Sequence, residues 1–116
     1  MNQREKGTEM ERIAAGWLIR QGCELIGHQY RTPYGELDLI YRDGDELVFG
    51  EVKYRSGTGF GMPAESVRTS KQQHLRKAAL LYAEHSGQAD SPMRFDVIEI
   101  LDRDGRRWIR QIKNAF

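Results

Sequence analysis

The feature that most limits what this chain can fold into is the run from Glu46 to Tyr54, which is apolar on both of its alternating faces. Side chains in a strand alternate between the two sides of a sheet, so such a run is typical of a central strand covered on both sides. An earlier apolar run, Glu36 to Tyr41, is joined to it through the turn Asp43-Gly44-Asp45. Two apolar runs around an Asp-Gly turn predict a β-hairpin at the centre of the fold.

Helices are expected on either side of this hairpin in the sequence. From Thr8 to Arg20 apolar residues recur at helical spacing, and Gly22 follows as a stop. A second helix is expected to begin at Thr69 or Ser70, which both offer N-caps, and to end within 85–87. Three further runs predict strands: Glu24 to Arg31, Met93 to Leu101 and Trp108 to Ile112. A helix between two strands favours a parallel crossover, so the sheet should be mixed.

Length and composition set the outer limits. A chain of 116 residues that is 39% apolar can bury one modest core, so residues 1–116 are expected to form a single α/β domain. No stretch has the length and hydropathy of a transmembrane helix, and the first residues lack the apolar region of a secretory signal. We therefore expect a cytoplasmic protein with no membrane association. The lone Cys23 cannot form an internal disulfide.

Charged residues interrupt the hairpin at positions that place them close together. Residues two apart in a strand share a face, so Glu36 and Asp38 point the same way on the first strand. Glu51 and Lys53 point the same way on the second strand. Asp38 and Glu51 are therefore expected to be neighbours across the hairpin.

This arrangement suits a divalent metal. Hard cations such as Mg²⁺, or Mn²⁺ in its place, are bound by one or two carboxylates together with waters and substrate phosphate. A bound ion would polarise a phosphoryl oxygen and lower the pKa of an attacking water, with Lys53 placed to orient that water or to stabilise negative charge. Glu9 lies on the flank of the first helix's apolar stripe and is a third candidate acid. The alternative is a partly buried ion-pair network with no catalytic use.

Several residues around these acids have open roles. Glu36 is either an acid supporting the metal ligands from the edge of the site or a strand-start charge that faces solvent. The segment Ser56–Pro63 contains three glycines and is expected to be a poorly ordered flap over the site. Arg55, Arg68 and Lys71 flank that segment and are candidate phosphate contacts, together with the start of the second helix. The plain alternative is that these cations are merely solvated. Asp96 is expected to be a buried acid that holds the fold.

The residues just described also carry a resemblance to a known family. The segments are KGTEMERIAA (Lys6 to Ala15), YRTPYGELDLI (Tyr30 to Ile40), LVFGEVKYR (Leu47 to Arg55), SKQQHLRKAA (Ser70 to Ala79) and RFDV (Arg94 to Val97). Together they resemble the bacterial YraN-like family of small endonuclease-like proteins over nearly the whole chain. That family is similar to Holliday-junction resolvases and other members of the PD-(D/E)xK nuclease superfamily.

The resemblance implies a restriction-endonuclease-like fold, with a central mixed β-sheet flanked by α-helices, and a metal site. The superfamily motif corresponds to Asp38, Glu51 and Lys53, and the acid of its first helix corresponds to Glu9. Leu37 stands where the superfamily name has proline, a departure that removes no ligand. The substrate class that the resemblance implies is nucleic acid. Under the nuclease hypothesis we expect DNA, with branched or damaged DNA as one candidate structure. Because related resolvases act as dimers, it also makes a homodimer a reasonable expectation.

Three functions follow as alternatives. The first is a Mg²⁺- or Mn²⁺-dependent nuclease, which the intact set Asp38, Glu51 and Lys53 favours. The second is a nucleic-acid-binding module with little catalysis. The third is a small interaction protein, which the formal net charge of only +1 favours. Zinc hydrolase, serine hydrolase and P-loop chemistries lack their motifs in this sequence.

Overall fold

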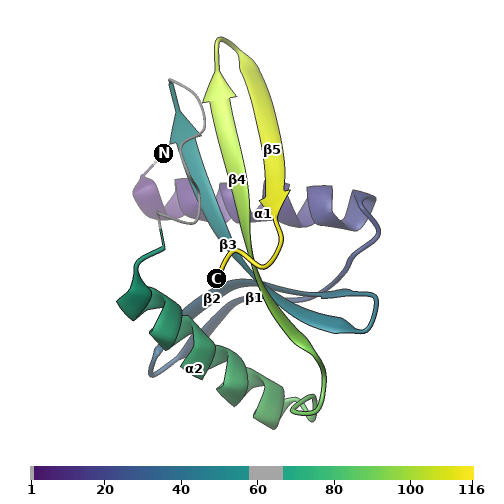
Figure 1. The fold of residues 1–116 in the computed structure, drawn as a ribbon. Helices are drawn as coiled ribbons and strands as arrows, with labels where there is room; N and C mark the ends of the chain where they lie inside the picture. Colours follow the sequence, from purple (N-terminus) through teal and green to yellow (C-terminus); the bar gives the residue numbers. More distant parts are fainter. Residues whose placement is uncertain (1, 58–66) are drawn as a thin grey trace.

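The computed structural model describes residues 2–57 and 67–116, in which two helices and five strands follow one another (Figure 1). In chain order they are α1 (Gln3–Arg20), β1 (Glu24–Thr32), β2 (Gly35–Asp43), β3 (Glu46–Ser56), α2 (Thr69–His85), β4 (Met93–Arg103) and β5 (Arg106–Ile112). The strands form a five-stranded sheet in the order β1-β2-β3-β4-β5. Among the described strands only the pair β3–β4 is parallel, and α2 lies between these two strands in the chain.

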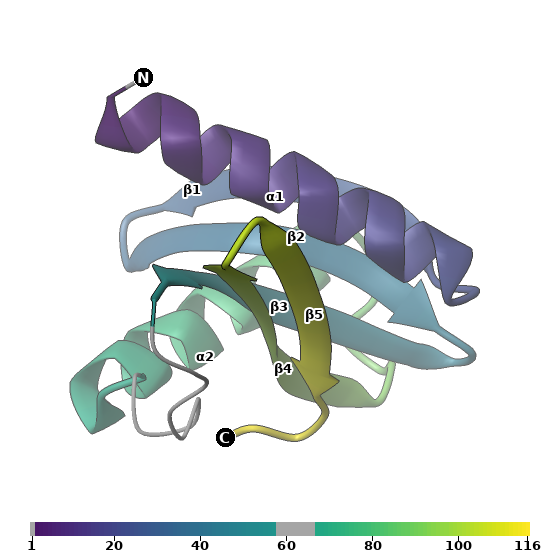
Figure 2. The same cartoon turned by 90° about the horizontal axis from the view of Figure 1, so that it is seen from above.

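The two helices lie on opposite sides of the sheet. In Figure 1 α1 passes behind the strands and α2 lies in front of them, and Figure 2 shows the same layers from above. The predicted hairpin, the mixed sheet and the helices on its two faces are therefore confirmed, and the fold is restriction-endonuclease-like. None of the described helices is long and apolar enough to cross a membrane.

The helix starts differ from those expected. The first helix begins at Gln3 rather than Thr8, because the side chain of Asn2 accepts a hydrogen bond from the backbone N–H of Glu5 at 2.8 Å and caps the added turn. The second helix has Arg68 at its N-cap without a side-chain capping bond, so the caps expected from Thr69 and Ser70 are not used. The expected flap, Ser56–Pro63, lies outside the described residues from position 58 onward.

Each helix packs on its own core. Residues of α1 such as Met10, Ala14 and Leu18 are buried against β2, β3 and β4, and these residues define the α1 side. On the other face, Leu75 and Ala79 of α2 are buried against a second apolar cluster, which defines the α2 side. Each fully buried Leu or Met side chain stabilises the fold by about 1.5–3 kcal/mol. Because a helix and its core cover each face of the sheet, β3 carries apolar side chains on both of its faces.

A buried polar network ties the strands together at one point. Asp96 of β4 has no exposed surface and accepts hydrogen bonds from Tyr41 at 2.8 Å, Gln111 at 2.8 Å and Arg94 at 2.9 Å. Arg94 is itself buried and also pairs with Asp43 at 2.9 Å. Every charge of this network has a partner, as a buried ion pair requires. The expectation that Asp96 is a structural acid is confirmed.

A close approach of side chains explains the glycine at the middle of β3. A Cβ added at Gly50 would lie 2.7 Å from Cδ1 of Ile98 and 2.9 Å from Cε1 of Tyr41. Both neighbours are fully buried, so neither can move aside easily. Gly50 therefore gives the neighbouring Tyr41 ring its place in the α1 side of the core.

We expect Gly50→Ala to lower the free energy of unfolding by about 1–3 kcal/mol, the usual result of overpacking a tight core. Gly16→Ala in α1 is the matched control, because its Cβ would meet only a terminal atom of Arg20 at 3.5 Å. That control should stabilise the protein by up to about 1 kcal/mol through helix propensity. Urea unfolding of both variants checks the pair, and equal effects of the two substitutions would contradict the packing argument.

Candidate active site

The site lies where β2 and β3 separate. Their pairing ends at Leu39 and Gly50, although β3 continues beside β4. Beyond this point a side chain replaces the backbone acceptor, since the carboxylate of Asp38 accepts a hydrogen bond from the N–H of Val52 at 3.0 Å. Leu37 packs on the α2 side while Leu39 packs on the α1 side, so regular alternation is broken at Asp38. The break places the Asp38 carboxylate between the two strands.

The surroundings of Asp38 oppose its negative charge. Burial raises the pKa of Asp38 to about 8, and the charge of neighbouring Glu51 is the second cause. The hydrogen bond from Val52 acts in the other direction but is outweighed. Glu51 is itself 6% exposed, so two carboxyl groups share a poorly hydrated place. In the absence of a cation, Asp38 therefore keeps its proton near neutral pH.

Two further acids meet Asp38, one from α1 and one from its own strand β2. Glu11 of α1 and Glu36 of β2 each offer a carboxylate oxygen, and with one from Asp38 these atoms all lie within 4.8 Å of one another. Burial raises the pKa of Glu11, and the charges of Glu36 and Glu51 add to the effect. The Oε1 atom of Glu11 is buried and has no hydrogen-bond partner among the described residues. An unsatisfied carboxylate oxygen in such a group is a donor suited to a cation.

Two lysines border the acids. Lys71, near the start of α2, forms an ion pair with Glu51. Burial opposes the charge of Lys71, but its hydrogen bond to Glu51 and the charge of that group raise its pKa overall. Lys53 behaves in the opposite way, since burial and the nearby charge of Lys71 lower its pKa despite the acids beside it. The site therefore holds one firmly protonated amine and one whose proton is held less tightly.

The acid that α1 contributes is Glu11, and the expected Glu9 does not meet the group. Glu9 lies on the other flank of the helix, close enough to Arg107 of β5 for their charges to attract. The reason is the rotation of α1 about its axis: Ala15 is buried, whereas Trp17 is only half-buried. Glu11 precedes Ala15 by one turn and so faces the sheet at the site.

The structure places the other predicted residues as follows. Asp38, Glu51 and Lys53 come together as expected, and Glu36 stands in the acidic group itself while also pairing with Arg31 at 3.2 Å. Sequence reasoning assigned Lys71 to phosphate, whereas here it pairs with Glu51.

The two predicted arginines differ in their surroundings. Arg55 pairs with Glu99 of β4, and Arg68 is exposed at the N-cap of α2. Their predicted role toward nucleic acid stays a prediction.

The donor set fits a hard divalent cation. Glu11, Glu36 and Asp38 supply carboxylate oxygens from two elements, and Glu51 stands beside Asp38. Such oxygens are the ligands preferred by Mg²⁺ and Mn²⁺. A bound cation would offset both the burial and the repulsion from Glu51 that raise the pKa of Asp38, and it would satisfy the buried oxygen of Glu11. No soft donor takes part in this group of described residues.

The mixed sheet with a helix on each face, and the acids where β2 and β3 separate, define a small protein of the restriction-endonuclease-like class. Residues 10–100 match the family described as "Uncharacterised protein family UPF0102". The chain is 42% identical over 113 residues to a UPF0102 protein of Syntrophomonas wolfei, covering 97% of this chain and 98% of that protein.

Two other relatives agree. A UPF0102 protein of Rhodococcus jostii is 42% identical over 111 residues, which cover 95% of this chain and 94% of that protein. A UPF0102 protein of Clostridioides difficile is 39% identical over 116 residues and the full length of both chains. This chain belongs to the UPF0102 family, which is YraN-like and PD-(D/E)xK nuclease-like, so the resemblance found in its sequence is confirmed.

Glu9 and Glu11 lie on different flanks of α1, so substituting each in turn compares their contributions to metal binding. We expect Glu11→Gln to weaken Mn²⁺ binding by at least about tenfold, because it removes one charge from the acidic group. Glu9→Gln should leave the affinity within about twofold, because Glu9 lies on the other flank of α1. Calorimetric titration with Mn²⁺ measures both. A larger loss from Glu9→Gln than from Glu11→Gln would contradict this assignment.

Proposed function

We propose that this protein is a Mg²⁺- or Mn²⁺-dependent nuclease that hydrolyses phosphodiester bonds in nucleic acid. The observation that carries the proposal is the group of carboxylates around Asp38 with the amine of Lys53 beside it. Membership of a PD-(D/E)xK nuclease-like family supports the same reading, since the motif acids and lysine are all present.

A purely structural network would differ in its charge balance. The network around Asp96 shows the difference, because Arg94 and three neutral donors satisfy that buried acid: the side chains of Tyr41 and Gln111 and the backbone N–H of Asn114. Around Asp38, acids from α1, β2 and β3 meet with too little positive charge, and burial together with the charges of Glu51 and Glu11 raises the pKa of Asp38. Such an arrangement destabilises the fold, and uncompensated acids of this kind are typical of sites that bind a cation or perform chemistry.

The residues of the chain divide the work between them. Asp38 and Glu51, with Glu11 and Glu36, would hold the cation. When bound, the cation supplies Lewis-acid chemistry that polarises the phosphoryl oxygen and acidifies water.

The two amines have separate parts. Lys53, whose pKa is lowered, can exchange a proton with the attacking water or donate to a phosphate oxygen. Lys71 forms an ion pair with Glu51, and with a cation bound beside Glu51 its amine would be placed to contact a substrate phosphate.

We expect Asp38→Asn and Glu51→Gln each to lower metal-dependent cleavage by about 100-fold or more, because each removes a charged group and keeps its shape. Single-stranded, duplex, flapped and four-way junction substrates should be screened with Mg²⁺ and Mn²⁺. The control is Asp90→Asn, an exposed acid in the loop between α2 and β4, which should retain full activity.

The folded state of each variant should be checked by circular dichroism. Cleavage that persists in both site variants, or in the presence of excess chelator, is incompatible with the proposal.

A further inference from the structure

One end of the sheet carries cations on the side that also holds Glu51. Phe49 of β3, Val97 of β4 and Ile112 of β5 all contact the core on the α2 side. Alternation along each strand and the register between strands place six residues closer to the β4–β5 turn on this same α2 side of the sheet. In Figure 1 neither helix lies in front of this part of the sheet. We call this set the hairpin face: Lys53, Arg55, Arg103, Arg106, Trp108 and Arg110.

Trp108 stands at the middle of the hairpin face. It is 42% exposed and belongs to neither apolar core, although its partner across the strands, Leu101, is buried. A single exposed hydrophobic residue needs no explanation by itself. Here, however, Arg106 and Arg110 stand two residues away on either side and share its face. An exposed indole between guanidinium groups is an arrangement that suits stacking on a base next to phosphates.

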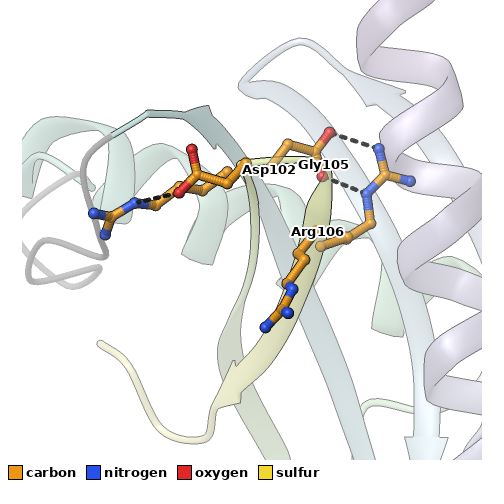
Figure 3. Close-up of a pocket in the computed structure, with 6 residues that line it drawn as sticks. Asp102, Gly105 and Arg106 are labelled. Atoms are coloured by element: carbon orange, nitrogen blue, oxygen red, sulfur yellow. Dashed lines mark hydrogen bonds and ion pairs between the residues drawn. The ribbon is translucent and has the colours of Figure 1, made fainter.

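Arg106 and Arg103 stand at the tip of the hairpin beside an open hollow of about 420 Å³ that residues 102–107 line. In Figure 3 Arg106 extends away from the ion pairs drawn there and takes part in neither. Arg103 reaches Asp104 only at 3.7 Å, in a pair where both side chains are at least half exposed. Such loose surface pairs hold a cation weakly and leave it available to a phosphate.

The opposite side of the same hairpin is arranged differently. There Arg107 donates two hydrogen bonds to Asp102, at 2.6 and 2.7 Å, and Tyr54 donates to the same carboxylate at 3.2 Å. The cation on the α1 side is therefore neutralised by a bidentate partner. The two sides of one hairpin thus differ in available positive charge, and the richer side is the one shared with the active site.

A buried acid fixes the cations nearest the site. Glu99 of β4 is fully buried, forms an ion pair with Arg55 of β3, and lies 3.8 Å from the guanidinium of Arg110 on β5. Among the described residues Arg55 donates only to Glu99, which leaves most of its N–H donors for another acceptor. Glu99 therefore orders a guanidinium group between the active site and Trp108 before any ligand arrives.

We propose that the hairpin face binds a single-stranded segment of nucleic acid adjoining the active site, with a base stacked on Trp108 and phosphates on Arg55, Arg103 and Arg106. This inference rests on the proposed nuclease function and specifies its substrate. In a duplex the faces of the bases are stacked on one another, so an exposed indole finds a free base face only on an unpaired strand. From Arg110 to Arg106 the strand spans about 13 Å, room for a few nucleotides.

The test measures binding without cleavage. A fluorescent single-stranded oligonucleotide and its duplex are titrated with the Asp38→Asn protein in excess chelator, and anisotropy is followed across a salt series. We expect Trp108→Leu to weaken single-strand binding by about tenfold and Trp108→Phe to restore most of it, because phenylalanine keeps an aromatic face. Duplex binding should change by less than about twofold.

The arginines are tested by salt dependence. The double variant Arg103→Ala, Arg106→Ala should lower the slope of log affinity against log salt by about 1.4, the loss of two contacts to a single strand. Arg107→Ala on the other side of the hairpin is the control and should leave the slope nearly unchanged. Thermal unfolding confirms that each variant is folded.

Three outcomes would overturn this inference: unchanged single-strand affinity in folded Trp108→Leu, equal losses for single strand and duplex, or a change of oligomeric state without a change in affinity. Because binding is measured without turnover, this test is separate from that of the nuclease. Absence of cleavage with every metal and substrate would contradict the proposed nuclease function and would not affect the binding results.

Discussion

The hydrogen bond from the backbone of Val52 to the carboxylate of Asp38 is the interaction on which the site depends. It replaces a bond between strands at the point where β2 leaves β3, so the sheet stays connected while its end opens. The same bond directs the Asp38 carboxylate toward Glu51 and leaves room for Glu11 from α1. A side chain in place of a backbone acceptor thus joins the architecture of the sheet to the chemistry at its end.

The networks around Asp96 and Asp38 differ in how well their buried charges are compensated. Asp96 has a guanidinium and three neutral donors around it, and these bonds connect the strands to one another. Asp38 has other carboxylates around it, so part of its burial is unfavourable until a cation arrives. The well-packed cores on both sides of the sheet stabilise the fold enough to offset the unfavourable charge around Asp38. In this way a small domain can keep a reactive site.

Much of this arrangement follows from local pattern. The alternation of β3 predicts that Glu51 and Lys53 share a face, and the Asp-Gly turn predicts that Asp38 lies across from them; both depend only on neighbours in sequence. The choice between Glu9 and Glu11 depends on how α1 is rotated against the sheet. That rotation is set by which small residues, here Ala14 and Ala15, fit under the strands.

Two other features of the site could not be predicted from local sequence pattern, because they also depend on how distant elements pack. The pairing of Lys71 with Glu51 joins α2 to β3, and the break in alternation at Asp38 depends on which core takes Leu37. Both arise from packing between distant elements. Sequence periodicity reports the face of one element and carries no information on its rotation against another.

The most direct test of the account is the pH dependence of unfolding with and without Mg²⁺. An acid with a folded pKa of about 8 and an unfolded pKa of about 4 keeps a proton in the folded state that the unfolded chain has lost. Its contribution to stability is therefore complete below about pH 4 and is lost as the pH rises through about 8.

Relative to Asp38→Asn, the metal-free protein should lose stability across that range, and added Mg²⁺ should restore more stability at pH 8 than at pH 6. Parallel pH profiles for the protein and Asp38→Asn, with the same effect of Mg²⁺ on both, would contradict the claim that a cation completes this site.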